Sequence, residues 1–398
     1  MDEQTLWGDK YDLSIVIPTR NRNRYASFAV TQAFLASDIH TQIVVQDNSD
    51  TCELAKMLPT DTRIKYSYSD EELSFSENFN RAIELCDGEY ICLIGDDDGI
   101  LPWIIDIVQW MKRERIEALY SSVYAGYVWP AEESEPCSIS GSLSLLFEKV
   151  KLVKHDCNNE ILKLMRKGGL EYLSSGLPRL YHGVIKRECM EAVRRITGKY
   201  FGGLSPDIYI ASALSTVIKA GYEITLPLTI AGVCPQSGTA ASVKGKHTGQ
   251  LSEAPHFRGI PKYNWAEKVP AFFSVECIWA DSAIHALIDL GCKDILSCFN
   301  TAAIDSYCYY KYSQFKELVF AHMRENGVTL NSIRFNRVRF MLYKYIPIII
   351  RKLTYSKGLM YRANNIQDIF QAQAATEQIY LKQGVKIDRV LADLAVSI

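Results

Sequence analysis

Three consecutive aspartates, Asp96, Asp97 and Asp98, follow the apolar run at residues 90–94 and lie between two glycines. Negative charges this close repel one another, so folding them together is unfavourable unless a cation neutralises them. Carboxylate oxygens suit Mg²⁺ or Mn²⁺, and these ions complete their coordination shell with water and substrate phosphates. The alternative is a solvated acidic loop. We predict a site for Mn²⁺ or Mg²⁺ on this turn.

Two further polar clusters occur earlier in the chain, and each also follows an apolar run. Residues 18–20 come directly after the run 13–17, and Asp47 follows the run 42–45. In open α/β sheets ligands bind at the carboxyl ends of the strands. We therefore expect these two clusters to share one edge of a sheet with residues 96–98.

The first 125 residues alternate between apolar runs of strand length and stretches with helical character. The strands are expected at 13–17, 42–45, 63–67 and 90–94, and the helices at 24–36 and 77–86 and after Pro102. This alternation predicts a mostly parallel, doubly wound α/β sheet of the Rossmann type.

The signals become weaker after residue 125. We expect a strand at 180–185, a helix from Pro206 to Ala220 that Gly221 closes, and a long mobile loop at 235–262, which is rich in Gly, Ser, Thr, Lys and His. Beyond residue 270 the pattern is mainly helical. The sequence thus predicts a catalytic core in two halves, 10–125 and 126–265, followed by a helical region at 266–398.

Composition excludes some classes of protein. Of 398 residues 48% are apolar and 23% charged, as in an ordinary folded protein, and the net charge of -2 gives no electrostatic case for nucleic-acid binding. The polar N-terminus and the lack of an apolar run of about 18–20 residues predict neither a signal peptide nor a membrane span. We expect a cytoplasmic protein, with peripheral contact on the inner face of the cell membrane as the alternative.

The motifs resemble, in order and spacing, those of family 2 glycosyltransferases with the GT-A fold. The matching segments are LSIVIPT followed by NR, then VVQDNS, then NRA, and then GEYI leading into GDDD. The resemblance implies an inverting transferase that uses a nucleotide sugar, most often a UDP-sugar. It implies that Pro18 and Thr19 line the nucleotide pocket and that Asp47 accepts a hydrogen bond from the base.

The resemblance also implies that the aspartate turn is the family's DxD motif. Asp96 and Asp98 would then contact the metal and the ribose, and Asp97 and Arg81 would belong to the donor site. The chain departs from the family at Gln46, where a second acid is frequent, and at Phe79, where an arginine is frequent. Both departures touch the nucleotide pocket, so the sequence leaves the identity of the base open.

Further basic residues have two interpretations each. Arg20 and Arg22 lie close enough to the sheet edge to meet a diphosphate, or they form a solvated basic loop. His247 lies between Lys244 and Lys246. Some GT-A enzymes carry a late histidine that joins the metal or contacts the diphosphate, and the alternative is an ordinary surface loop.

Asp207 is the candidate catalytic base. An inverting transfer needs one carboxylate to remove a proton from the attacking hydroxyl, and a Lewis acid on the leaving diphosphate. Asp207 is expected in the first turn of a helix, at a position that resembles the family's later acidic motif; the alternative is simple helix capping. His182 would line the acceptor site or form an ordinary hydrogen bond within a strand.

The segment 331–364 contains eight basic residues and no acidic residue, with aromatic and aliphatic residues between them. This mixture is typical of a segment that lies on an anionic membrane surface. The alternative is a helix that packs on the core with a basic outer face. Many acceptors of the family are lipid-linked, which would give a membrane contact a use.

Together these features predict a metal-dependent glycosyltransferase that acts on a glycan or lipid-linked glycan in bacterial surface polysaccharide synthesis. A nucleotidyltransferase on a related fold is one alternative, but residues 19–23 lack the glycine-rich phosphate loop that it would need. A catalytically silent scaffold that binds a nucleotide sugar is another.

Overall fold

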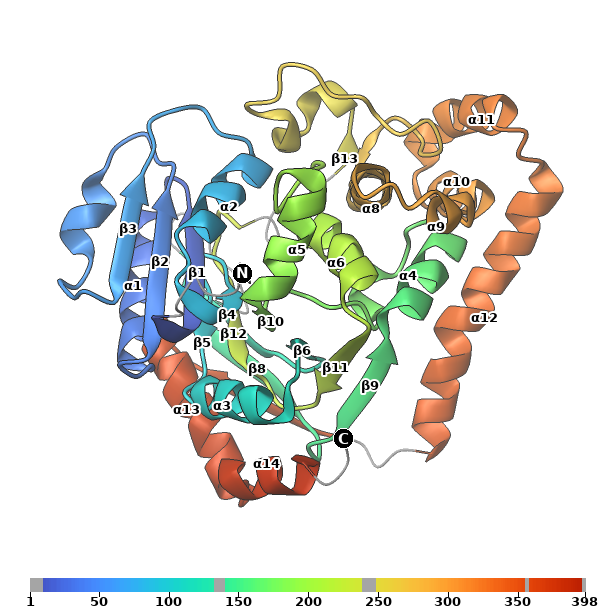
Figure 1. Ribbon diagram of the computed structural model, residues 1–398. Helices are drawn as coiled ribbons and strands as arrows, with labels where there is room; N and C mark the ends of the chain where they lie inside the picture. The colour runs from blue at the N-terminus through green and yellow to red at the C-terminus, as the bar shows by residue number, and fades with distance from the viewer. Residues whose placement is uncertain (1–9, 132–139, 238–247, 355–357, 396–398) are drawn as a thin grey trace, which may run out of the picture.

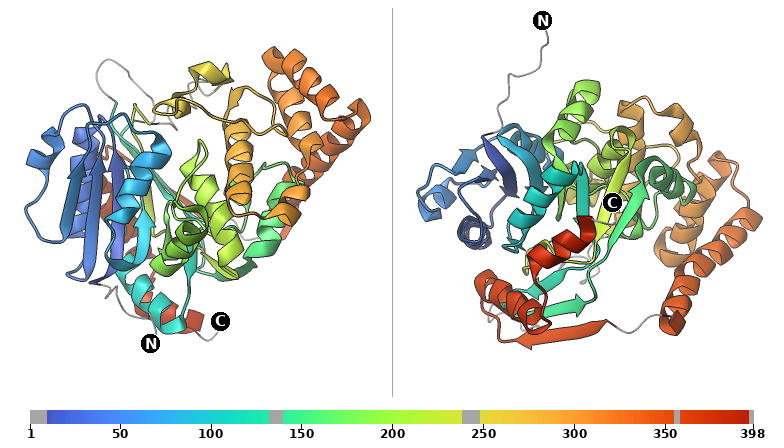
Figure 2. Two further views of the ribbon diagram at one scale, coloured as in Figure 1. Left: turned by 45° about the horizontal axis from the view of Figure 1, so that its top comes forward. Right: turned by 60° about the horizontal axis from the view of Figure 1, so that its bottom comes forward.

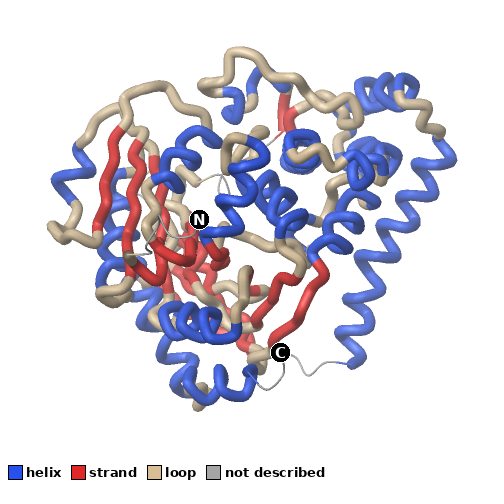
Figure 3. The backbone as a smooth tube through the Cα atoms, in the orientation of Figure 1, coloured by secondary structure: helices blue, strands red, loops and turns tan. Residues whose placement is uncertain are grey.

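The computed structural model describes residues 10–131, 140–237, 248–354 and 358–395. A large sheet runs through the molecule with helices on both faces, and further helices lie beyond one end of it (Figure 1). Figure 3 shows the strands in red, with the helices of residues 275–354 gathered at one side of them.

Within the described residues the large sheet has eight strands, in the order β3-β2-β1-β4-β10-β6-β11-β9. The strands are β1 (Tyr11–Thr19), β2 (Thr41–Asp47), β3 (Ile64–Tyr68), β4 (Gly88–Leu93), β6 (Ala118–Ser121), β9 (Leu152–Asp156), β10 (Gly183–Lys186) and β11 (Ala220–Ile224). Among them β10 and β9 run antiparallel to their neighbours, and the others share one direction. The predicted α/β fold class is confirmed, with two reversed strands that the sequence does not predict.

Alternate residues of the central strands face different helices, as the two-residue period of a strand requires. Ile15 and Ile17 belong to one core cluster and Val16 to another. The first cluster includes residues of α1 (Asn23–Leu35) and α3 (Ile104–Glu114). The second includes residues of α2 (Phe75–Glu84), α5 (Arg187–Thr197) and α6 (Pro206–Val217). Both faces are covered, which explains the continuous apolar runs.

A smaller sheet pairs a strand from the C-terminal region with strands from residues 99–233. Its order in the described residues is β15-β8-β7-β12-β5, comprising β5 (Gly99–Ile100), β7 (Ala125–Val128), β8 (Ser142–Phe147), β12 (Thr229–Val233) and β15 (Leu359–Asn364). After β15, helices α13 (Ile369–Lys382) and α14 (Ile387–Ala395) contact α1 and α3 (Figure 2). The end of the predicted helical region therefore packs into the sheet and core of the first half.

The remaining helices form a layer beside α6. They are α4 (Cys157–Arg166), α8 (Val275–Asp289), α9 (Lys293–Ser297), α10 (Thr301–Lys311), α11 (Lys316–Glu325) and α12 (Leu330–Thr354). α8 packs against α6, and α12 packs against α10. This layer confirms the mainly helical character predicted beyond residue 270. No helix in the described ranges combines the length and apolar character that crossing a membrane requires.

Two local predictions need correction. The helix predicted to reach Ala220 ends at Val217, because the chain after Ile218 pairs as β11 with β6 and β9, and Gly221 lies inside that strand. Part of the predicted long loop is ordered into short elements. They are β13 (Thr248–Gly249), which pairs with β14 (Phe273–Ser274), and the 3-10 turns η3 (Leu251–Glu253) and η4 (Pro255–Phe257). Residues 238–247 lie outside the described ranges.

Candidate active site

The three polar clusters meet at one edge of the sheet. Thr19, the last residue of β1, pairs in register with Asp47, the last residue of β2. The backbone N–H of Asn48 donates to the carbonyl oxygen of Thr19 at 3.0 Å. The Thr19 hydroxyl donates to Asp96 Oδ2 at 2.7 Å. The expected juxtaposition of strand ends is therefore present, and side-chain bonds link it.

The aspartate turn is buried. The exposed fractions are 2% for Asp96, 5% for Asp97 and 2% for Asp98, which excludes a solvated loop. Burial raises the pKa of Asp96 to about 6, and it also raises the pKa of Asp97. Charged carboxylates in such a place require hydrogen bonds or a cation.

Arg22 supplies one positive charge to this turn. Its Nη1 lies 2.8 Å from Asp96 Oδ1 and 3.6 Å from Asp97 Oδ1. The interpretation of Arg22 as part of a solvated loop is therefore wrong. Arg20, in contrast, is half-buried, and its Nη2 lies 3.4 Å from Oδ1 of the exposed Asp50. The structure brings Arg22 to the acidic turn and leaves Arg20 at the rim.

Asp98 is held by residues far away in the sequence. Its Oδ1 accepts a hydrogen bond from Gly232 N at 2.7 Å, and its Oδ2 accepts from Gly95 N at 2.6 Å and from the Tyr181 hydroxyl at 2.9 Å. A Cβ on Gly232 would lie 1.7 Å from the carbonyl oxygen of Asp97, so only glycine fits there. The end of β12 thus fixes the orientation of the turn.

Asp207 lies in the first turn of α6. Burial raises the pKa of Asp207 to about 6, and the negative charge of Asp98 adds to the increase. In the described part of the chain no group donates a hydrogen bond to its carboxylate. Its place in the first turn also fits the alternative, a favourable interaction with the helix dipole.

His182 lies in the turn just before β10 and makes a side-chain hydrogen bond, as one of its two interpretations expected. One ring nitrogen, Nδ1, lies 2.8 Å from Thr229 Oγ1, and the other, Nε2, lies 3.4 Å from Asp98 Oδ2. His182 is therefore hydrogen-bonded, and it also borders the acidic turn. His247 lies outside the described residues.

The carboxylates of the aspartate turn are the candidate ligands of a metal ion. No group of three or more His, Cys, Asp or Glu side chains in the described ranges converges in a way that could hold one. Two carboxylates are nevertheless enough for Mg²⁺, which usually takes its other ligands from substrate phosphates and water. Asp96 Oδ1 already contacts a cationic group, the Arg22 guanidinium. The carboxylate oxygens of Asp96 and Asp98 therefore fit a hard cation such as Mg²⁺, with substrate phosphates and water as its other ligands.

Asp47 and Arg81 lie together at the outer part of the same edge. Asp47 is buried and accepts hydrogen bonds from Ser49 N and the Tyr66 hydroxyl, both at 2.8 Å. Arg81 Nη1 donates to Ser69 Oγ at 2.8 Å, and its Nη2 lies 2.5 Å from Glu71 Oε2. Pro18 is buried within β1, opposite Gln46.

Several buried polar atoms beside the end of β2 have no partner among the described residues. They are Nε2 and Oε1 of Gln46, Oδ1 of Asn78 and Nη1 of Arg258. The other terminal nitrogen of Arg258 donates to Asn48 Oδ1 at 2.8 Å and contacts the carbonyl oxygen of Leu73. Unsatisfied buried groups are uncommon in proteins, and a bound polar ligand would satisfy them. Arg258, Tyr181 and Gly232 are site residues that the sequence did not reveal.

Comparisons with known proteins agree with the motifs. Residues 14–135 match the family model described as Glycosyl transferase family 2, so the resemblance to this family is confirmed over that segment. The match ends before Tyr181, Asp207 and Gly232. No curated protein matches the sequence.

Solved structures of S. aureus TarS are also similar to this chain. TarS 1-349 in complex with UDP-GlcNAc aligns with a TM-score of 0.46 and 12% identity over 94% of this chain and 92% of that chain. TarS 1-349 in complex with UDP aligns with a TM-score of 0.41 and 14% identity over 90% of this chain and 98% of that chain.

Proposed function

We propose that this protein is an inverting glycosyltransferase that moves a sugar from a nucleotide sugar, of the UDP-sugar class, to a hydroxyl of a glycan or lipid-linked glycan. One observation carries the proposal. The negative charge of a buried aspartate turn, at the ends of β1, β2 and β4, acts on Asp207, a carboxylate with a raised pKa and no hydrogen-bond donor in the described residues. The family match supports the transferase class.

The donor is assigned to the edge formed by Thr19, Asp47 and the aspartate turn. The unpartnered amide of Gln46 and the Nη1 of Arg258 would satisfy their hydrogen-bonding capacity on the nucleotide. Arg22 is assigned to the diphosphate, because a guanidinium binds phosphate oxygens with paired N–H groups. To do so it would turn from Asp96 towards the donor.

A metal ion, Mn²⁺ or Mg²⁺, held by Asp96 and Asp98, would supply a Lewis acid to the leaving diphosphate. The Tyr181 hydroxyl and the N–H groups of Gly95 and Gly232 hold the Asp98 carboxylate in its orientation. Their hydrogen bonds leave one lone pair of Oδ1 for a further partner.

In the transfer, the oxygen of the acceptor hydroxyl attacks the anomeric carbon of the sugar. Asp207 accepts the hydroxyl proton, the bond between the anomeric carbon and the phosphate oxygen breaks, and the nucleoside diphosphate leaves with the electron pair. Attack opposite to the leaving group inverts the configuration. A base with a pKa of about 6 is mostly ionised at neutral pH and still able to take up a proton. Bacterial surface polysaccharide synthesis is the proposed pathway.

A thermal-shift panel tests the donor site first. UDP, GDP, CMP and dTDP are each added with and without Mn²⁺ to the wild type and to Asp96→Asn, which keeps the side-chain shape. We expect one nucleotide to raise Tm in a metal-dependent way, and the variant to lose that rise. Arg20→Gln, at the rim of the same edge, serves as the control.

Hydrolysis of the matching nucleotide sugar without acceptor then separates a catalyst from a binder. A slow metal-dependent release of nucleoside diphosphate is expected. A folded protein that no nucleotide stabilises would contradict the proposal, and one that binds a nucleotide but never releases it from the sugar would be a silent scaffold.

A further inference from the structure

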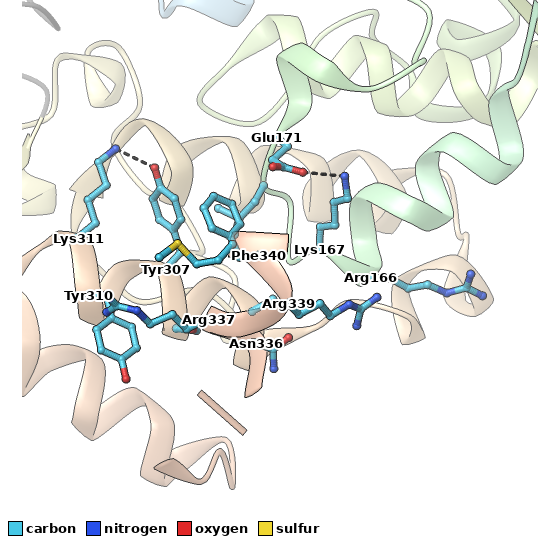
Figure 4. A pocket seen from close by; sticks show the side chains of 14 residues that line it. Arg166, Lys167, Glu171, Tyr307, Tyr310, Lys311, Asn336, Arg337, Arg339 and Phe340 are labelled. Carbon is cyan, nitrogen blue, oxygen red and sulfur yellow. Dashed lines mark hydrogen bonds and ion pairs between the residues drawn. The ribbon is translucent and has the colours of Figure 1, made fainter. Parts of the chain in front are cut away.

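A second concave site lies away from the aspartate turn. A cavity of about 450 Å³ is enclosed by the end of α4 and the residues after it, by α10 and by α12 (Figure 4). None of the residues that line it belongs to the aspartate turn, to the strand ends beside it or to the start of α6. Its role is therefore separate from donor binding and proton transfer.

The charge of this cavity is strongly positive. Its described lining contains five basic residues and one acidic residue, Glu171. Lys167 is paired with Glu171 at 2.7 Å, and Lys311 is paired with Glu276 at 2.7 Å. Arg166 and Arg337 have no acidic partner within the described ranges. The cavity thus offers guanidinium groups whose charge is not compensated.

Arg337 is held in place by an aromatic ring. Its guanidinium carbon lies 3.8 Å from the centre of the Tyr310 ring, and Figure 4 shows the two side chains together. Stacking through the face of the guanidinium leaves the N–H groups at its edge available for an anion. Guanidinium groups bind phosphate oxygens through such paired donors.

Apolar residues also line the cavity. They are Leu170, Ala303, Phe340 and Met341. An inorganic anion would make no use of these side chains. The combination fits a phosphate ester carried on an apolar stem, because the lining offers both cationic and apolar groups.

The face of α12 that points away from the cavity carries exposed apolar side chains. Phe335, Val338 and Leu342 are 67%, 59% and 53% exposed, and their spacing of three and four residues places them in one stripe. Ile333 and Asn336 of the same helix are buried against the opposite side. An exposed apolar stripe on a helix with basic and no acidic residues is typical of a segment at an anionic lipid interface.

We propose that the cavity binds the phosphate head group of an anionic lipid through Arg166 and Arg337. The shared chemistry is a phosphate ester, and lipid is the source that the apolar residues of the lining favour. The proposal does not depend on the transferase reaction, so its test uses no donor and no metal.

The test is co-sedimentation of the full chain with vesicles of phosphatidylcholine alone or mixed with phosphatidylglycerol. We expect binding to the mixed vesicles only, and weaker binding as salt increases. The double variant Arg166→Gln, Arg337→Gln should reduce partitioning roughly 30-fold, because each basic residue near an anionic surface contributes about fivefold. Arg113→Gln, Arg195→Gln removes the same charge at exposed positions elsewhere and should reduce it far less.

Two further measurements identify other ligands. Glycerol 3-phosphate tests the soluble source: binding that needs Arg166 and Arg337, without any vesicle binding, would overturn the lipid assignment. Sedimentation velocity tests a second copy of the chain: self-association that Val338→Glu abolishes, again without vesicle binding, would assign the stripe to a protein interface. Equal partitioning of both double variants would overturn the role of the cavity.

Discussion

Replacement of Asp207 by asparagine tests the proposed chemistry most directly. Asparagine keeps the side-chain shape but cannot accept the proton, and removal of a general base typically lowers turnover by about 10²- to 10⁴-fold. The assay is release of nucleoside diphosphate from the nucleotide sugar that the thermal-shift panel selects, with water as the acceptor. The ordinary substrate-binding groups are untouched, so KM for the donor should change little.

The raised pKa predicts how the wild type depends on pH. The active form of Asp207 is the ionised one, so activity should rise with pH through about 6, the pKa that burial and the charge of Asp98 produce. About 90% of this carboxylate is ionised at pH 7 and about 10% at pH 5, so the rate should fall about ninefold between them. An ordinary aspartate would lose almost nothing over that range.

Stability provides an internal control for the same variant. Because the fold raises the pKa of Asp207, its ionisation opposes folding above pH 6, so the asparagine variant should be at least as stable as the wild type at pH 8. Glu188→Gln, a first-turn acid on α5 with an exposed side chain, is the matched control and should keep full activity. Activity of Asp207→Asn within threefold of the wild type at pH 7 would refute the assignment.

Three other predictions concern the framework around the site. Tyr181→Phe removes a hydrogen bond to the Asp98 carboxylate and should lower the free energy of unfolding by about 2 kcal/mol, and it should also weaken metal-dependent nucleotide binding; unchanged values in urea titration and thermal shift would contradict this. Gly232→Ala places a methyl group against the Asp97 carbonyl and should destabilise the protein by about 3 kcal/mol, whereas the φ-positive but open Gly198 should tolerate alanine with a smaller loss in the same urea titration. Glu223 bonds His155 and Tyr120, and the His155 bond is the main cause that lowers its pKa to about 2. The ionised Glu223 carboxylate therefore adds about 3 kcal/mol to the free energy of unfolding above pH 4.5, and this contribution should be lost between pH 4.5 and 2. Urea unfolding at acid pH should show this loss in the wild type but not in Glu223→Gln.

Much of the fold could be predicted because its signals are local. Strands buried on both faces appear as continuous apolar runs, so β1, β2 and β4 were located within a few residues of their bounds. The reversal of β9 and β10 was not predictable in this way. Strand direction depends on which segments pair, and no local pattern records that choice.

The sequence by itself determined which residues stand at the strand ends. Thr19, Asp47 and Asp96 each stand two residues after an apolar run, and parallel strands bring their carboxyl ends to one edge. The need for a positive charge beside the aspartate turn also followed from the sequence, because consecutive carboxylates repel one another. These conclusions depend only on the order and spacing of residues along the chain, which are known from the sequence.

Only the tertiary structure decided how these groups are charged and held. The burial of the aspartate turn, the contact of Asp96 with Arg22, and the bonds from Tyr181 and Gly232 to Asp98 join segments up to about 130 residues apart. The raised pKa of Asp207 likewise arises from its burial and from Asp98. Solvent exclusion and pair distances are properties of the packed chain, and the same residues at the same spacing would titrate normally in water.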